Sequence, residues 1–154
     1  GGEKARAAAV EDHLEFARAD AGRLPFPDDA FDAVFAMRFF HLADTPASFL
    51  SEMARVARNT VFFDTFRETS ARSAYNWLLP MGSRLYSRRE VEHLLDDVGL
   101  TLRDSAHDFL VPYGVYRSLP GGAARPLREV DTAVGGTPLG RYLSTVSYWT
   151  TSVE

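Results

Sequence analysis

Residues 31–37, FDAVFAM, form a nearly continuous apolar run that constrains the fold more than any other stretch of the sequence. A short run of this kind is typical of a parallel strand that helices cover on both faces, because such a strand has no side facing water. The preceding Pro25, Pro27, Asp28 and Asp29 break regular structure and predict a surface loop. We therefore expect a loop that leads into a buried strand of an α/β protein.

The rest of the sequence alternates between strand-like and helix-like patterns. Ser87 and Glu90 match a capping box at the start of a helix, and Gly99 is placed to end it. Apolar residues at helical spacing predict helices over residues 46–57, 87–98 and 121–135. β-Branched and aromatic runs predict further strands over residues 14–20, 60–66, 100–111 and 143–153. This order predicts a doubly wound α/β domain with a mostly parallel sheet, in which the last two strands form an antiparallel edge.

The composition is that of an ordinary globular chain, and it excludes several kinds of site. At 154 residues the sequence has the length of one domain, so we expect residues 1–154 to form a single unit. The absence of cysteine excludes disulfides and thiolate chemistry, and the histidines lack metal-ligand spacing, so no metal site is expected. A net charge of −4 without a basic track gives no indication of nucleic-acid binding. With no apolar window long enough for a membrane span and no readable leader, we expect a cytoplasmic protein that does not enter a membrane.

Three spaced features in the first part of the chain form a recognisable set. Asp20 follows the first predicted strand, residues 24–34 read LPFPDDAFDAV, and residues 52–56 read EMARV. This set resembles the class I methyltransferases that use S-adenosylmethionine, particularly those that act on small molecules. In that family an acidic residue closes the third strand, L-P-F-x-D-x-x-F-D opens the fourth, and E-x-x-R-V lies on the following helix. The resemblance is close over residues 5–66 and rests on element order beyond them; it implies a Rossmann-like methyltransferase fold with S-adenosylmethionine as the cofactor.

The resemblance also assigns cofactor-binding roles to four positions. It implies that the Asp20 carboxylate accepts a hydrogen bond from the adenine amino group and that the backbone of Ala21 lies beside the same ring. It further implies that Ala36 and Met37, at the end of the next strand, run along the methionine portion of the cofactor. Two simpler interpretations stay open, in which Asp20 only caps a turn and Met37 is ordinary core.

Few side chains are candidates for catalysis. His41 follows the strand near the expected position of the transferred methyl group, and a histidine can accept a proton near neutral pH. Alternatively, its ring only satisfies a backbone carbonyl within the apolar stretch FFHL. Glu52 and Arg55 lie one helical turn apart and most simply form an intrahelical ion pair. Because in-line placement of the nucleophile and the methyl group supplies much of the acceleration, the reaction does not require a dedicated catalytic residue.

In the resembled family the acceptor pocket is built from the segment after the fifth strand and from segments near the last two strands. Aromatic residues gather in the corresponding parts of this chain and could line a pocket for an apolar or planar acceptor. Ordinary core packing explains each of them singly as well. The candidates are Tyr75, Trp77, Tyr86, Tyr113 and Tyr116.

Two cofactor motifs of the resembled family are missing from the sequence. The glycine-rich turn after the first strand and the acidic residue that ends the second strand are both absent. The simplest interpretation is an N-terminally truncated fold, in which these residues are the later part of a longer protein. In the family's strand order, 3-2-1-4-5-7-6, the two absent strands separate residues 14–20 from residues 31–37. Either these two segments pair directly, or a second molecule completes the sheet as a homodimer, or the absent residues belong to the protein but not to this sequence.

The sequence thus supports two functions from different classes. The leading one is S-adenosylmethionine-dependent methyl transfer to an unidentified small molecule, weak or absent in the chain as given. The alternative is a non-catalytic methyltransferase-like module for binding or dimerisation. A nucleotide-binding oxidoreductase of similar topology is disfavoured, because L-P-F-x-D-x-x-F-D is not typical of that class.

Overall fold

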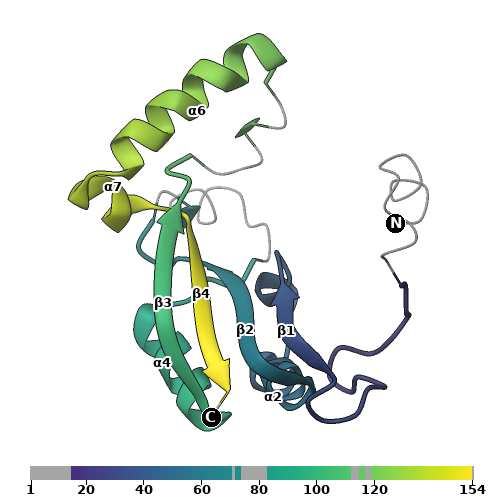
Figure 1. Ribbon diagram of the computed structural model, residues 1–154. Helices are drawn as coiled ribbons and strands as arrows, with labels where there is room; N and C mark the ends of the chain where they lie inside the picture. The colour runs from purple at the N-terminus through teal and green to yellow at the C-terminus, as the bar shows by residue number, and fades with distance from the viewer. Residues whose placement is uncertain (1–14, 71, 74–82, 112–114, 117–118, 154) are drawn as a thin grey trace.

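A computed structural model describes the sheet and most of the helices of the chain. The described residues are 15–70, 72–73, 83–111, 115–116 and 119–153. Four strands form one sheet (Figure 1), namely β1 (Phe31–Ala36), β2 (Ala57–Phe66), β3 (Leu100–Asp108) and β4 (Val146–Val153). Their order across the sheet is β1-β2-β4-β3. β1 and β2 are parallel, whereas β4 runs antiparallel to both β2 and β3, so the predicted antiparallel edge is confirmed and the described sheet is mixed.

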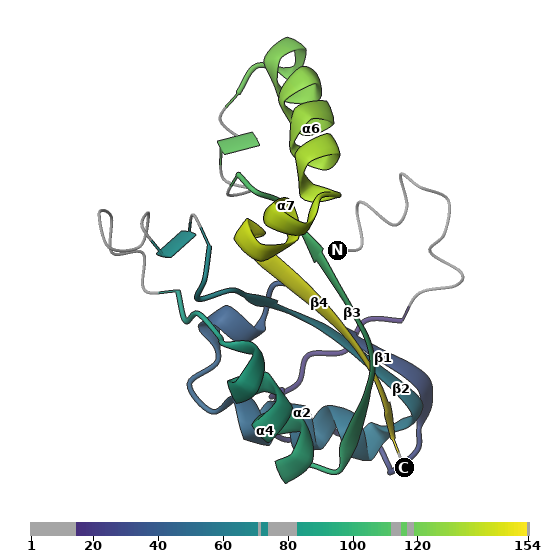
Figure 2. The same ribbon diagram turned by 90° about the vertical axis from the view of Figure 1, so that its left-hand side faces the viewer.

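The helices lie on one face and at one end of this sheet. They are α2 (Pro46–Val56), α4 (Arg88–Asp97), α6 (Gly121–Gly135) and α7 (Pro138–Leu143), with a short 3₁₀ turn η2 (Phe40–Leu42). α2 and α4 cover the same face of the sheet (Figure 2). α6 and α7 lie past the end of the sheet at which β3 ends and β4 begins. The second helical layer of a doubly wound fold is therefore not seen in the described part of the chain. No helix within that part is both long and apolar enough to span a membrane.

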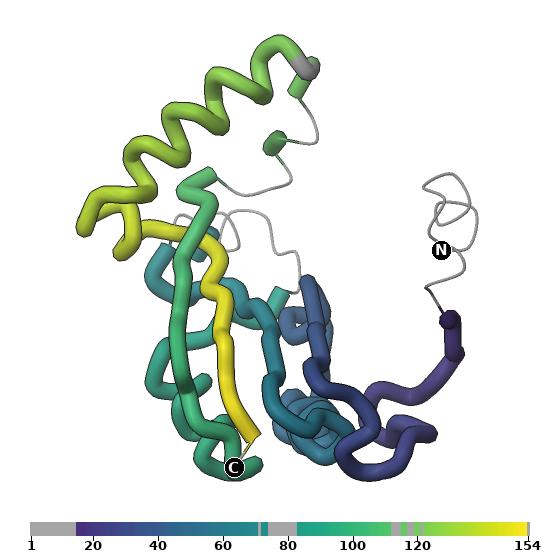
Figure 3. The backbone as a smooth tube through the Cα atoms, in the orientation of Figure 1, coloured from purple at the N-terminus to yellow at the C-terminus, as the bar shows by residue number. Residues whose placement is uncertain are grey.

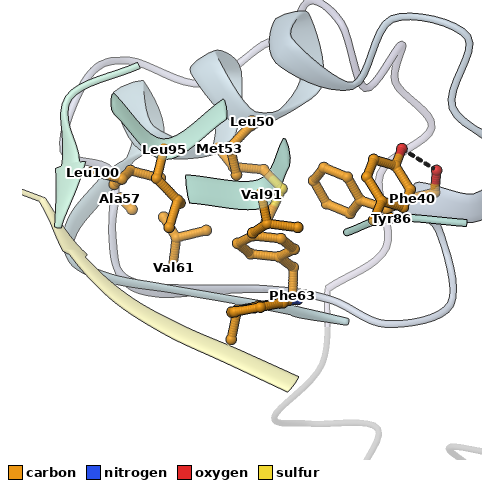
Figure 4. Packing of buried hydrophobic residues seen from close by; sticks show 11 residues of the cluster. Phe40, Leu50, Met53, Ala57, Val61, Phe63, Tyr86, Val91, Leu95 and Leu100 are labelled. Carbon is orange, nitrogen blue, oxygen red and sulfur yellow. Dashed lines mark hydrogen bonds between the residues drawn. The ribbon is translucent and has the colours of Figure 1, made fainter. Parts of the chain in front are cut away.

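The hydrophobic core fills the space between the sheet and the two covering helices (Figure 4). The Phe40 and Phe63 rings pack with their centroids 4.7 Å apart, and the Tyr86 hydroxyl donates a hydrogen bond of 3.0 Å to the Phe40 carbonyl. Alternation along β2 sends every second side chain toward these helices. The cluster comprises Phe40, Leu50, Met53, Ala57, Val61, Phe63, Tyr86, Val91, Leu95, Leu100 and Trp149.

The predicted ends of α4 are confirmed. The Ser87 hydroxyl oxygen accepts a hydrogen bond of 3.1 Å from the Glu90 amide, as an N-cap does. Gly99 follows the helix with φ of +71°, a left-handed conformation that favours glycine. The Glu90 carboxylate pairs with Arg84 at 2.6 Å.

The strand predicted over residues 14–20 is wrong within its described part. Residues 15–19 have no regular structure, and Asp20 forms only an isolated bridge with Arg23. Figure 3 shows residues 15–30 running outside the sheet before they turn into β1. Alternating apolar residues favour a strand only where a neighbouring strand is available to pair with it, and the described chain offers none there.

The expectation that residues 31–37 are buried on both faces is also wrong. The Phe35 side chain is 68% exposed and that of Met37 is 49% exposed. β1 is an edge strand in the described sheet, and only the face toward α2 is covered. On the uncovered face the Phe35 and Phe62 rings lie 5.5 Å apart, and Tyr148 stacks on Phe62 at 6.1 Å.

Candidate cofactor and acceptor site

A cavity of about 350 Å³ lies beside β1 and brings together three of the four predicted cofactor residues, Ala21, Ala36 and Met37. Its volume lies within the range of roughly 300–1,000 Å³ that small-molecule sites occupy. The other walls come from the loop before β1, from β1 itself and from α2. They consist of Leu24, Val34, Phe35, Phe39, Phe49 and Met53.

Asp20 lies in a turn at the side of this cavity. Its Oδ1 atom accepts a hydrogen bond of 2.9 Å from the Gly22 amide, and its carbonyl accepts one of 3.0 Å from Arg23. A Cβ atom added to Gly22 would lie 3.5 Å from both Asp20 Oδ1 and the Phe49 ring, so these two side chains meet at Gly22. The carboxylate therefore does cap a turn, as the simpler interpretation held. Its Oδ2 atom has no hydrogen-bond partner in the described part of the chain, and the residue is exposed.

These walls suit a ring with a polar edge rather than a metal ion. Apolar side chains form most of the surface, and the Asp20 carboxylate lies next to the lining residue Ala21 in the chain without lining the cavity itself. Within the described residues, no group of three or more His, Asp or Glu side chains is placed to hold a metal.

Glu52 and Arg55 on α2 fix the loop that carries one wall of the cavity. They form the predicted ion pair at 2.8 Å. The Arg55 guanidinium also donates to the carbonyls of Phe26 at 2.8 Å and Leu24 at 3.1 Å, and it pairs with Asp28 at 2.8 Å. The Glu52 carboxylate accepts a hydrogen bond of 2.7 Å from the Leu24 amide. Hydrogen bonds from Arg55 and from this amide lower the pKa of Glu52 to about 2.

Sequence reasoning missed this second role of the pair. Spacing along one helix predicts that Glu52 and Arg55 meet each other, but it cannot show that they also bind residues 24–28. One feature of the sequence indicated the contact between them: the LPFPDD loop and the EMARV helix both belong to the same family pattern.

His41 and Asp64 form a titratable pair next to the carboxyl end of β1. The Asp64 side chain is 3% exposed and accepts a hydrogen bond of 2.5 Å from the Arg38 amide, and burial raises its pKa. Burial, followed by the positive charge of Arg72, lowers the pKa of His41, while Asp64 opposes the shift. The ring of His41 packs 4.6 Å from that of Phe66 and makes no hydrogen bond to any described residue. A lowered pKa keeps the imidazole neutral near pH 7, in the form that can accept a proton.

The predicted acceptor residues are only partly described. Tyr75, Trp77 and Tyr113 lie outside the described residues. Tyr86 is 2% exposed, and its hydroxyl is bound to a core carbonyl, although its ring also borders a cavity of about 200 Å³ next to α4. The Tyr116 hydroxyl donates to the Asp131 carboxylate, and burial with this bond raises the pKa of Tyr116 to about 12. The two described tyrosines are thus held by different partners.

Comparison with known proteins supports the resemblance in the first part of the chain. Residues 2–63 match the family described as "Methyltransferase domain". Over 63 residues the chain is 44% identical to a fatty-acid O-methyltransferase of Mycolicibacterium smegmatis. The aligned part is 41% of this chain but only 22% of that relative.

Solved structures extend the likeness to the fold of the whole chain. The [4+2]-cyclase SpnF superposes with a TM-score of 0.66 and 20% identity, covering 99% of this chain and 61% of that one. A geranyl diphosphate C-methyltransferase from Streptomyces coelicolor gives a TM-score of 0.63 and 16% identity, covering 100% of this chain and 59% of that one. This chain therefore spans less than two thirds of either structure. The predicted resemblance to methyltransferases is thereby confirmed by sequence over residues 2–63, and the solved structures confirm the Rossmann-like methyltransferase fold.

Proposed function

We propose that this protein transfers a methyl group from S-adenosylmethionine to a small organic molecule. The observation that carries the proposal is the single cavity lined by Ala21, Ala36 and Met37, with the Asp20 carboxylate at its side. The relative that is 44% identical over 63 residues is named a fatty-acid O-methyltransferase, which agrees with a small-molecule acceptor. Because the glycine-rich turn is absent from the sequence, we expect the 154-residue chain alone to bind the cofactor weakly.

Each proposed residue has a simple task at this site. The Asp20 Oδ2 atom accepts a hydrogen bond from the adenine amino group, while Oδ1 stays bound to Gly22. The apolar walls around Ala36 and Met37 would contact the methionine portion. The bound cofactor supplies a sulfonium methyl group for in-line transfer. His41 does not line this cavity but follows β1 in the chain, and its neutral imidazole would accept the acceptor's proton where the nucleophile carries one.

The test is calorimetry with S-adenosylhomocysteine on both the 154-residue chain and the full gene product. We expect Asp20→Ala to weaken binding by about tenfold, the loss of one good hydrogen bond. Asp20→Asn retains an oxygen for the Gly22 amide and should lose less. Asp32→Asn is the matched control, because Asp32 is exposed at the start of β1 and pairs only with Arg58 at 2.6 Å among the described residues. Absence of binding by both proteins would rule out the proposal.

A second candidate function is a non-catalytic module that pairs with another copy of itself. It is favoured by the outer edge of β1, which no described strand pairs with, and by the exposed aromatic side chain of Phe35 beside Phe62. The structural likeness to a [4+2]-cyclase agrees with this candidate, because it indicates that proteins of this fold do not all perform the same reaction. Light scattering without cofactor should then give a dimer, and a strictly monomeric protein would exclude this homodimer.

A further inference from the structure

A larger cavity, of about 780 Å³, lies at the opposite edge of the sheet from β1. Arg67, which follows β2, lines it together with the end of β3, and α7 contributes Arg141 and Tyr142. Figure 1 shows α7 beside the end of β3. Arg67 and His107 also line the adjoining cavity of about 200 Å³ that reaches the start of α4. The 780 Å³ cavity shares no lining residue with the one beside β1, so it is a separate site.

Positive charge is concentrated on the walls of this cavity. The Arg67 guanidinium is partly buried and donates a hydrogen bond of 2.7 Å to the Arg141 carbonyl. No carboxylate of the described residues lies within ion-pair distance of Arg67 or Arg141. Burial lowers the pKa of His107, and the charges of Arg67, Arg88 and Arg141 lower it further. Three arginines thus lie close enough to His107 to lower its pKa.

The acidic residue on the same wall does not neutralise these arginines. The Asp108 carboxylate accepts hydrogen bonds from the two terminal guanidinium nitrogens of Arg128, at 2.6 and 3.0 Å. Arg88, in the adjoining cavity, is likewise paired, with Glu92 at 2.7 Å. Each of these charges has its own partner, which leaves Arg67 and Arg141 as the cations on these walls without an ion pair to any described residue. Arg67 is partly buried, and partial burial of a cation without a counter-ion is unfavourable unless an anion binds there.

We propose that Arg67 and Arg141 bind the carboxylate of a small organic acid in this cavity. Guanidinium groups recognise carboxylates through charge-assisted, often bidentate hydrogen bonds. The hydroxyl group of Ser105 comes from the same walls and can donate to a remaining oxygen lone pair, whereas the Thr132 hydroxyl already donates to the Arg128 carbonyl at 2.8 Å.

An organic acid fits better than inorganic phosphate, because a hollow of about 560 Å³ with an apolar side adjoins the charged cavity. Tyr142 lines both spaces, and Leu110 and Leu143 form the apolar side of the hollow. The rest of the hollow is lined by Glu68, Thr69, Ser70 and Ser73. A carboxylate head at the arginines could therefore extend an apolar chain past Tyr142. Phosphate can also bind the arginines through its negative charge, but it has no apolar chain that could occupy the hollow.

The test is an NMR titration of the 154-residue chain with sodium octanoate and, separately, with sodium phosphate at low salt. We expect saturable octanoate shifts at the Arg67, His107 and Arg141 amides. Arg67→Gln and Arg141→Gln should each weaken binding by about tenfold or more, the loss of one charge-assisted contact. Arg141 is exposed, so its variant should fold even if Arg67→Gln does not. Arg58→Gln removes the same charge at the far end of β2 and is the matched control.

Binding of octanoate that is lost in both pocket variants and kept in the control would support the proposal. Binding of phosphate but not octanoate would overturn the assignment to organic acids and leave a phosphate site. No saturable binding, or octanoate binding that Arg67→Gln and Arg141→Gln leave unchanged, would overturn the site itself. The titration contains no cofactor, so its failure would not bear on the proposed methyl transfer.

Discussion

The buried carboxylate of Asp64 accepts a hydrogen bond of 2.5 Å from the backbone amide of Arg38, which ties the chain leaving β1 to the carboxyl end of β2. Arg38 has φ of +57°, a left-handed conformation that is unfavourable for a residue with a side chain. The hydrogen bond holds this turn, and the turn directs the chain from Met37 toward His41. One acidic side chain thus helps to fix the backbone between the proposed cofactor cavity and the candidate base, together with the hydrogen bond from the Arg84 amide to the His41 carbonyl.

The first prediction concerns the charge of Asp64. Burial raises its pKa above the ordinary value of 3.8, which means that the fold favours the protonated carboxyl. This contribution to stability is full below pH 3.8 and is lost as the pH rises through the raised pKa and the carboxyl ionises. Asp64→Asn cannot ionise and keeps an oxygen that can accept from Arg38. We expect this variant to melt higher than the wild type at pH 8 and to lose that advantage toward pH 4, as measured by calorimetry. An equal decrease in melting temperature at both pH values would contradict the argument.

A buried hydrogen bond between β2 and β4 gives the second prediction. The Trp149 indole N–H donates a hydrogen bond of 2.9 Å to the Thr65 hydroxyl, and both residues are 2% exposed. Thr65→Val keeps the shape but leaves the indole N–H unpaired, so unfolding in urea should require about 1–3 kcal/mol less. Thr65→Ser keeps the hydroxyl and is the control. Equal losses in both variants would assign the effect to packing rather than to the hydrogen bond.

Local patterns predicted most of the fold because they depend on residues that are close in sequence. The cap at Ser87, the helix end at Gly99 and the strand over residues 60–66 are confirmed for this reason. Residues 14–20 show the limit, since alternation alone cannot provide a neighbouring strand.

The candidate sites were harder to predict, because their contacts join separate segments. The resemblance selected Ala21 and Met37, which do line one cavity. Nothing in the local sequence indicates that Arg67 lies beside Arg141, because these residues meet only when α7 packs near the start of β4. Sequence spacing reports neighbours on one element, whereas a pocket is built from several.

The third prediction tests the left-handed position after α4. Gly99 has φ of +71°, and a Cβ added there would touch nothing within 4 Å. The cost of Gly99→Ala is therefore one of backbone conformation alone, about 1 kcal/mol of unfolding free energy. Gly99→Asn should cost less, because asparagine tolerates this region. Equal stability of the alanine variant and the wild type in urea would show that the backbone relaxes at no cost.

The final prediction concerns the loop held by Glu52. The depression of its pKa from 4.5 to about 2 means that its carboxylate stabilises the fold above pH 4.5, and this contribution is lost as pH falls through about 2. Glu52→Gln weakens the contact with Arg55 and with the Leu24 amide, so it should lower the melting temperature at pH 7 and converge with the wild type near pH 2. Glu92→Gln is the matched control, because the Glu92 pair with Arg88 lies on the surface and should contribute little. Since Leu24 lines the cavity beside β1, Glu52→Gln should also weaken S-adenosylhomocysteine binding at pH 7, whereas Glu92→Gln should not. Unchanged binding together with a lower melting temperature would limit the role of Glu52 to stability and separate the loop from the proposed cofactor site.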